Sequence, residues 1–217
     1  MKRLNMNSGR LKKLRLGALR HDFPIIAAMV PPGTRVLDIG CGDGDLLQFL
    51  SLERQVDGRG MELSQAGVNA SVTRGLAVVQ GNADTDLADY PDGAFDVVIL
   101  SQSLQVLHDP RGVLEQMLRI GRSAIVSFPN FGYWRVRWDL LTRGRMPITS
   151  DLPVPWYDTA NIHLCTILDF LALCDEMDLH IDQALTLSRR GAAKPIGTAR
   201  GWANLVGEQG VFLLQRR

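Results

Sequence analysis

The residues of this chain best suited to ligand chemistry lie in one short run, residues 36–44 (Val-Leu-Asp-Ile-Gly-Cys-Gly-Asp-Gly). The apolar, β-branched first half favours a buried strand. The three glycines can adopt positive φ angles and let the backbone approach a ligand closely. Asp38 adds a carboxylate two residues before the first glycine, and Asp45 begins an amphipathic stretch typical of a helix. A strand, a bare turn and a helix N-terminus predict a cofactor-binding cradle at the carboxyl edge of a parallel sheet.

The spacing of the glycines separates two classes of cofactor. A dinucleotide-binding fingerprint requires a third glycine five residues after the first, and Asp45 occupies that position. A nicotinamide-dependent dehydrogenase is therefore disfavoured. The pattern Asp-x-Gly-x-Gly-x-Gly of residues 38–44 instead resembles motif I of the class I S-adenosylmethionine-dependent methyltransferases.

Two further segments strengthen this resemblance. Residues 60–64 (Gly-Met-Glu-Leu-Ser) place Glu62 20 residues after Gly42, at the tip of a second expected strand. An acid at that position is where a ribose diol finds its acceptor. Residues 80–84 (Gln-Gly-Asn-Ala-Asp) follow a third expected strand. The glycine-rich loop alone is weak evidence, whereas the three segments together are strong evidence.

The resemblance implies S-adenosylmethionine, or its demethylated product S-adenosylhomocysteine, as the cofactor. The glycine turn would hold the amino-acid part of this molecule, with Asp38 near its ammonium group. Glu62 would accept both ribose hydroxyls, and Ser101 would line the sulfonium pocket. Cys41 lies in the cradle as a small residue that fits a tight turn.

The adenine would be recognised by the third segment. The side chain of Asn82 or of Asp84 and the backbone N–H of Ala83 would contact its edge, and Leu63 would pack on its face. The predicted cofactor-binding residues are therefore Asp38, Gly40, Cys41, Gly42, Glu62, Leu63, Asn82, Ala83, Asp84 and Ser101.

Catalytic residues are much less clear. Methyl transfer from a sulfonium requires chiefly alignment, and it needs a base only if the acceptor must lose a proton. His163 and Tyr157 are weak candidates, and His108 lies in a loop where a structural role is more usual. No pair of His or Cys residues has metal-ligand spacing, so no metal is expected.

Strands and helices alternate along the chain. Strands are expected at about 35–39, 57–62, 76–80, 95–100, 123–128, 179–187 and 210–215, and helices at about 22–30, 45–54, 64–73, 111–120 and 166–176. This order predicts an α/β fold with a doubly wound, mostly parallel, seven-stranded Rossmann-like sheet of the class I methyltransferase type.

Residues 129–160 interrupt this rhythm. Prolines punctuate the segment, and it holds three of the four Trp residues of the chain together with several Arg residues. We interpret it as an insertion that forms either a lid or a recognition surface, because Trp, Tyr and Arg dominate interface hot spots. A small aromatic core under a loop is the alternative. We expect residues 1–20 to be a basic arm and residues 21–217 to be one domain with this insertion.

Bulk properties indicate a protein of ordinary globular type. The 217 residues are 46% hydrophobic and 22% charged, and no apolar run is long enough to cross a membrane. Three Cys residues without a CxxC pair indicate reduced thiols and a cytoplasmic location. The arm holds seven bases and no acid, but without interleaved aromatic residues a role in nucleic-acid binding is disfavoured.

Longer motifs indicate a narrower family. Residues 31–38 (Pro-Pro-Gly-Thr-Arg-Val-Leu-Asp), 99–105 (Ile-Leu-Ser-Gln-Ser-Leu-Gln), 127–135 (Ser-Phe-Pro-Asn-Phe-Gly-Tyr-Trp-Arg), 155–157 and 161–163 resemble the MetW family of methionine biosynthesis proteins. The resemblance covers about residues 20–187. It implies a methyltransferase-like fold and an association with homoserine O-acyltransferase (MetX), which acylates homoserine on the way to methionine.

Two functions follow from the resemblance. The first is an S-adenosylmethionine-binding accessory protein that supports the acyltransferase, with the insertion as its contact surface. The second is an active small-molecule methyltransferase, in which the insertion is a substrate lid. Both use the same cradle, so motif I does not separate them. A second copy of this chain is a further candidate partner.

Overall fold

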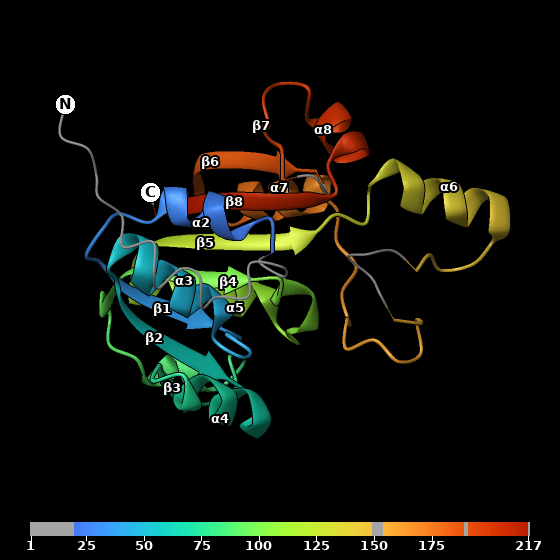
Figure 1. Ribbon diagram of the computed structural model, residues 1–217. Coiled ribbons are helices and arrows are strands. Elements are labelled where there is room, and N and C mark those ends of the chain that lie inside the picture. Colours follow the sequence, from blue (N-terminus) through green and yellow to red (C-terminus); the bar gives the residue numbers. More distant parts are fainter. Residues whose placement is uncertain (1–19, 149–153, 189–190, 217) are drawn as a thin grey trace, which may run out of the picture.

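One twisted sheet of eight strands runs through the computed structural model, which describes residues 20–148, 154–188 and 191–216 (Figure 1). The strands are β1 (Arg35–Ile39), β2 (Asp57–Glu62), β3 (Ala77–Gln80), β4 (Phe95–Ser101), β5 (Gly121–Pro129), β6 (His180–Leu187), β7 (Ala193–Pro195) and β8 (Gln209–Gln215). The helices are α2 (Phe23–Met29), α3 (Asp45–Arg54), α4 (Gln65–Thr73), α5 (Pro110–Ile120), α6 (Trp134–Arg143), α7 (Ile167–Glu176) and α8 (Arg200–Val206), with short 3-10 helices η1 (Asp86–Asp89) and η2 (Leu104–Val106).

The strand order is β3-β2-β1-β4-β5-β8-β6-β7. Strands β1 to β5 are parallel, and β8 inserts antiparallel between β5 and β6. The predicted α/β class and mostly parallel sheet are confirmed. The prediction of seven strands was wrong, because β7 adds an eighth strand at the edge beside β6. Its three residues, Ala-Lys-Pro, are too few to show an alternating pattern, and proline is tolerated at a sheet edge.

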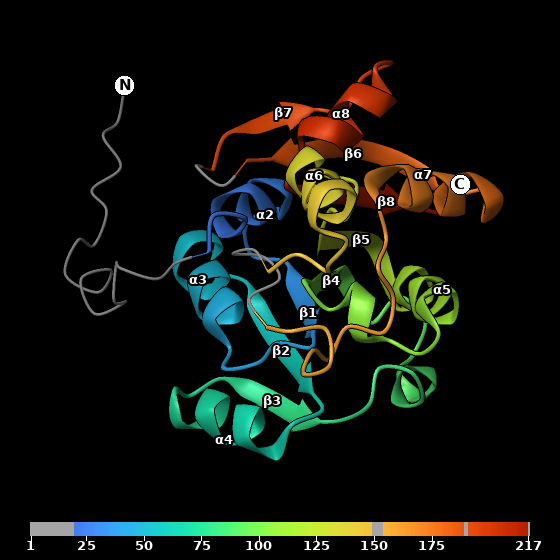
Figure 2. The same ribbon diagram turned by 90° about the vertical axis from the view of Figure 1, so that its right-hand side faces the viewer.

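Alternate residues of the central strands pack on opposite faces of the sheet. In β1, Val36 packs with α2 and α3, and the next residue, Leu37, packs with α5 and α7. In β4, Val97 and Ile99 belong to the first face and Val98 to the second. Figure 2 shows α2 and α3 on one side of the sheet and α5 and α7 on the other. This period of two fixes which side chains reach the core and leaves the strand ends free for a site.

Asn130 holds the end of β5 to the C-terminal part of the chain. Its buried side chain donates to the carbonyl oxygens of Asn204 and Gly207, both at 2.7 Å. The side-chain oxygen of Asn130 accepts from the N–H groups of Gly132 at 2.9 Å and Ile167 at 3.1 Å. One side chain therefore joins β5, the first residue of α7 and the region of α8.

The segment predicted as an insertion contains a helix that the sequence reasoning did not assign, α6. It extends beyond the carboxyl ends of the parallel strands (Figure 1), and the described residues before α7 cross in front of those ends (Figure 2). Only Val136 of this helix is buried, whereas the Leu141 side chain is 80% exposed. Within the described ranges, no helix has the length and apolarity needed to cross a membrane.

Candidate cofactor site

The glycine turn follows β1 where the order of the strands reverses, since β1 pairs with β2 on one side and with β4 on the other. Ligands of open α/β sheets bind at such a switch point, outside the carboxyl ends of the strands. Gly40 has a φ of +68°, and a Cβ atom there would lie 2.6 Å from the Ser103 hydroxyl oxygen. The glycine is therefore required both by the backbone and by the available space.

The turn offers close approach rather than free donors. The N–H groups of Gly40 and Cys41 both donate to the Met61 carbonyl, at 2.8 and 3.2 Å. The N–H of Gly42 donates to the Glu62 carboxylate at 2.9 Å. These three donors are therefore not free to bind an anionic group of a ligand.

A first cavity of about 330 Å³ lies beside the ends of β1, β2 and β3. It brings together six of the predicted residues, from three separate segments of the chain. Its lining is Ile39, Gly40, Met61, Glu62, Leu63, Gly81, Asn82, Ala83, Asp84, Ser103, Val106, Leu107 and Ala160. The mixture of apolar walls and a few polar groups is typical of a pocket for a small molecule.

Glu62 is held in place by the backbone around it. One of its carboxylate oxygens accepts from the Gly42 N–H, and the other accepts from the Ser64 N–H at 2.8 Å. Each oxygen keeps a second lone pair. A fixed carboxylate on the wall of this cavity suits the two adjacent hydroxyls of a ribose.

Asp84 also has a task other than the one expected of it as an adenine reader. Its carboxylate accepts from the backbone N–H groups of His108 at 3.0 Å and Asp109 at 2.9 Å, and thereby fixes the loop after η2. The Asn82 side-chain oxygen accepts from the Asp84 N–H at 3.0 Å. Asn82, Ala83 and Asp84 all line the cavity, and their role in reading an adenine edge stays a prediction.

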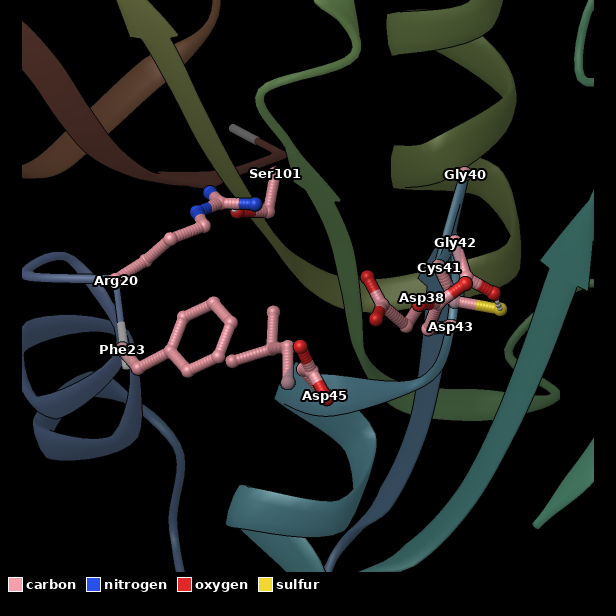
Figure 3. A pocket seen from close by; sticks show the side chains of 10 residues that line it. Arg20, Phe23, Asp38, Gly40, Cys41, Gly42, Asp43, Asp45 and Ser101 are labelled. Atoms are coloured by element: carbon pink, nitrogen blue, oxygen red, sulfur yellow. Dashed lines mark hydrogen bonds between the residues drawn. The ribbon is translucent and has the colours of Figure 1, made fainter. Parts of the chain in front are cut away.

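A second cavity of about 230 Å³ shares Gly40 with the first. It contains the remaining predicted residues, including Asp38 and Ser101. Its lining is Arg20, Phe23, Asp38, Gly40, Cys41, Gly42, Asp43, Asp45, Leu46 and Ser101. In Figure 3 the Asp38 carboxylate, beside the glycine turn, and the Arg20 guanidinium, beside Ser101, lie on opposite sides of the open space.

Asp38 is only 2% exposed, and its carboxylate has no hydrogen-bond partner among the described residues. Burial raises its pKa from 3.8 to about 7; the nearby acids Asp22 and Glu62 raise the pKa further, and Arg20 opposes them. Desolvation disfavours the charged form, and a cation that enters the cavity would restore it. The geometry therefore favours a ligand with a positive charge at this point.

A polar network beside Asp38 was missed by the sequence reasoning. Arg20 forms an ion pair with the buried Asp22 and donates to the Ser101 hydroxyl at 2.7 Å. The hydroxyls of Ser101 and Ser127 each donate to the Asp22 carboxylate at 3.3 Å. From the sequence, Arg20 was interpreted as the end of the basic arm and Asp22 as the start of a helix. No spacing in the sequence links either residue to strands about 80 to 105 residues away.

The Cys41 thiol is not activated as a nucleophile in this site. Burial and the neighbouring Asp38 and Glu62 carboxylates raise its pKa to about 12, so it stays protonated at neutral pH. The expected role of Cys41 as a small residue in a tight turn stays a prediction. Among the described residues, no group of three or more His, Cys, Asp or Glu side chains could hold a metal ion.

The weak catalytic candidates lie outside both cavities. Tyr157 is 73% exposed and stacks edge-on against Trp156. His163 is exposed, and its backbone N–H donates to the Gln105 carbonyl at 3.0 Å. Their roles as bases or donors stay predictions.

Comparison with known proteins assigns this chain to a narrower family than the geometry of the site does. The sequence model of the family described as "Methionine biosynthesis protein MetW" matches residues 20–214. The bifunctional methionine biosynthesis protein MetXA/MetW of Rhodopirellula baltica is 34% identical over 174 residues, which are 76% of this chain and 28% of that protein. Ajmaline N-methyltransferase of Rauvolfia serpentina is 30% identical over 96 residues, 41% of this chain and 32% of that protein. The chain thus spans less than half the length of these curated relatives.

Solved structures support the fold. An S-adenosylmethionine-dependent methyltransferase from Mesorhizobium loti is 17% identical with a TM-score of 0.66, covering 92% of this chain and 99% of that one. A possible histamine N-methyltransferase from Thermotoga maritima has the same TM-score at 15% identity, covering 91% of this chain and 88% of that one. The fold is therefore that of the class I methyltransferases. The family model spans almost all of the described residues, and the long motifs fall within its match, so this chain belongs to the MetW family of methionine biosynthesis proteins.

Proposed function

We propose that this chain binds S-adenosylmethionine and acts as an accessory protein of homoserine O-acyltransferase. Its membership of the MetW family supports a role in methionine biosynthesis. The observation that carries the choice of partner is the Rhodopirellula relative, whose name assigns a MetXA and a MetW part to one chain. Fusion keeps two parts at a high effective concentration, which is useful when the parts act on each other.

The two cavities support S-adenosylmethionine as the ligand. Glu62 in the first cavity suits the ribose diol, and Asp38 in the second suits the ammonium group of the amino-acid part. The N–H groups of Gly40, Cys41, Gly42 and Gly44 are engaged. The bonds of Arg20 to Asp22 and Ser101 use only its Nε and Nη2 groups, so we assign the α-carboxylate to this guanidinium. A carboxylate and a guanidinium on opposite walls match the two charges of an amino acid. S-Adenosylhomocysteine has the same three features.

Arg20→Gln is expected to weaken S-adenosylmethionine and S-adenosylhomocysteine binding about tenfold, because a charge-assisted hydrogen bond to the ligand carboxylate is lost. Glutamine keeps a side-chain donor for the Ser101 hydroxyl. Binding of 5′-methylthioadenosine, which lacks the amino-acid part, should not change. Isothermal titration of the three ligands checks this, with Arg35→Gln, at an exposed ion pair with Asp96, as the matched control. Equal weakening for all three ligands would show that Arg20 shapes the pocket instead.

Affinity for S-adenosylmethionine is expected to fall in mild acid. Since the pKa of Asp38 is about 7 without ligand, its ionised fraction drops as the pH falls through that value. Between about pH 7.5 and pH 6 the dissociation constant should rise roughly five- to tenfold, while that of 5′-methylthioadenosine stays constant. A flat profile for both ligands would exclude Asp38 as the ammonium partner.

The alternative is an active small-molecule methyltransferase, supported by the fold of its structural neighbours. The described residues that line the two cavities include no His and no Tyr, and the one Cys has a raised pKa. An acceptor that must lose its proton would therefore have only carboxylates to take it. The accessory role needs no such base.

The deciding experiment is the homoserine O-acylation rate of the purified cognate acyltransferase, measured with and without this protein over a range of S-adenosylmethionine concentrations. We expect the rate to increase when the protein is present. No change in rate, together with no association between the two proteins, would contradict the accessory role and direct attention to a screen of methyl acceptors.

A further inference from the structure

The segment Val154–Leu164, which we call the strap, touches the first cavity from outside the sheet. Ala160 is the strap residue in the lining of that cavity, across from residues of β2 and η2. The backbone N–H groups of Ile162 and His163 both donate to the Gln105 carbonyl, at 2.8 and 3.0 Å. The strap is therefore attached to η2, an element that itself lines the cavity through Val106.

The strap also carries exposed aromatic side chains. Trp156 is 71% exposed and Tyr157 is 73% exposed. Trp156 also lines a groove of about 250 Å³. The other lining residues are Phe131, Met146, Pro147, Val154, Thr159, Asn161 and Leu164. Trp138 on α6 is 58% exposed. Monomeric proteins rarely expose so many large apolar side chains in one region unless the region binds a partner.

The attachment point has an unusual backbone conformation and two polar atoms without a partner among the described residues. Gln102 adopts a positive φ of 61°, which is uncommon for a residue other than glycine. Its side-chain nitrogen, and the side-chain oxygen of the buried Gln105, are enclosed without a hydrogen-bond partner in the described structure. Buried polar groups are nearly always paired, so two such atoms next to the strap are hydrogen-bonding capacity that another arrangement or a ligand could use.

We propose that the strap couples the two sides: its outer face, with Trp156, Tyr157 and Trp138 of α6, docks the homoserine O-acyltransferase, and a ligand in the first cavity orders the strap through Ala160 and strengthens that docking. This proposal rests on the function proposed above, which supplies the occupant. The physical basis is preorganisation, because a segment ordered by one ligand loses less conformational entropy when it binds a second. Linkage requires the reverse effect as well, so the acyltransferase must tighten S-adenosylmethionine binding by the same factor.

The docking half is tested by measuring the dissociation constant between this protein and the purified acyltransferase. Trp156→Ala combined with Tyr157→Ala is expected to weaken docking at least tenfold, while S-adenosylmethionine binding changes less than twofold. Trp202→Ala is the matched control, because Trp202 is 66% exposed on α8. The control should bind like the unmodified protein. Normal docking by the double variant would overturn the assignment of this surface.

The coupling half is tested by repeating the measurement at saturating S-adenosylmethionine, where we expect docking to tighten at least fivefold. Ile162→Pro removes the backbone N–H that donates to the Gln105 carbonyl. Ile162→Ala also loses most of the isoleucine side chain but keeps this N–H. The Pro variant should lose most of the ligand effect and the Ala variant should keep it, with unfolding midpoints of both checked. Docking that is unchanged or weakened by the ligand would overturn the coupling.

These outcomes are separable from failure of the proposed function. If the unmodified protein neither binds the acyltransferase nor changes its rate, the proposed function itself is wrong. If the unmodified protein does both and the strap variants behave in the same way as it does, the function stands and the inference about the strap is wrong.

Discussion

Asp38→Asn is expected to stabilise the ligand-free protein while nearly abolishing its affinity for S-adenosylmethionine. The carboxylate is buried and unpaired among the described residues, and its pKa is raised to about 7 by burial. Ionising such a group in the folded state therefore opposes folding. The same charge is what a cationic ligand would need, so one substitution should move stability and binding in opposite directions.

The size of the effect follows from the pKa. A folded-state pKa of about 7 against an ordinary value of 3.8 corresponds to about 4 kcal/mol of destabilisation above pH 7. Because the unfolded chain ionises first, this penalty is absent below about pH 4 and grows as the pH rises to about 7. Burying the Asn amide without a partner offsets part of the gain, by about 1–3 kcal/mol. The net gain above pH 7 should be about 2 kcal/mol.

The test is thermal and urea unfolding of the Asp38→Asn variant and of the unmodified protein at about pH 8 and pH 5, with ligand titration at pH 8. At pH 8 the variant should melt about 5 °C higher, and the advantage should shrink or vanish at pH 5. Asp43→Asn is the control, since Asp43 lines the same cavity but is exposed. A variant that is less stable at pH 8 would show that the Asp38 carboxylate contributes to folding.

Local motifs made the cofactor side of this protein predictable. The strand, the glycine turn and α3 are contiguous, and the predicted bounds of α3, 45–54, agree with the structure. Glu62 was located by its distance from the turn, because each βα unit of a parallel sheet has a nearly fixed length. Such features depend on short stretches of chain, and a short stretch can be interpreted without knowing the rest of the fold.

Long-range contacts could not be predicted in the same way. The Arg20 and Asp22 network depends on α2 lying beside the ends of β4 and β5, which no spacing in the sequence records. The helix α6 was missed because its Trp and Arg residues are interpreted equally well as a loop that binds a partner. Its burial confirms how weak the signal was, since only Val136 packs inward.

Asn130→Ala is expected to be among the most destabilising substitutions in the chain. The side chain makes four hydrogen bonds while only 3% exposed. Its removal leaves two carbonyl groups and the Gly132 N–H without that partner, whereas the Ile167 N–H retains a bond to the Asn204 side chain at 3.1 Å. Each buried polar group left unpaired costs about 1–3 kcal/mol, so we expect a loss of about 3–5 kcal/mol.

Urea unfolding of the variant checks this value, with Asn69→Ala on the exposed surface of α4 as the control, expected within about 0.5 kcal/mol of the unmodified protein. Hydrogen exchange should show where the loss acts. Asn130 joins β5 to α7 and the region of α8, so the amides there should lose protection first, while the turn between β1 and α3 keeps it. Ligand binding should then survive in the variant, because the turn between β1 and α3 is held by other contacts. Equal loss of protection in both regions would instead show that the sheet unfolds as one cooperative unit.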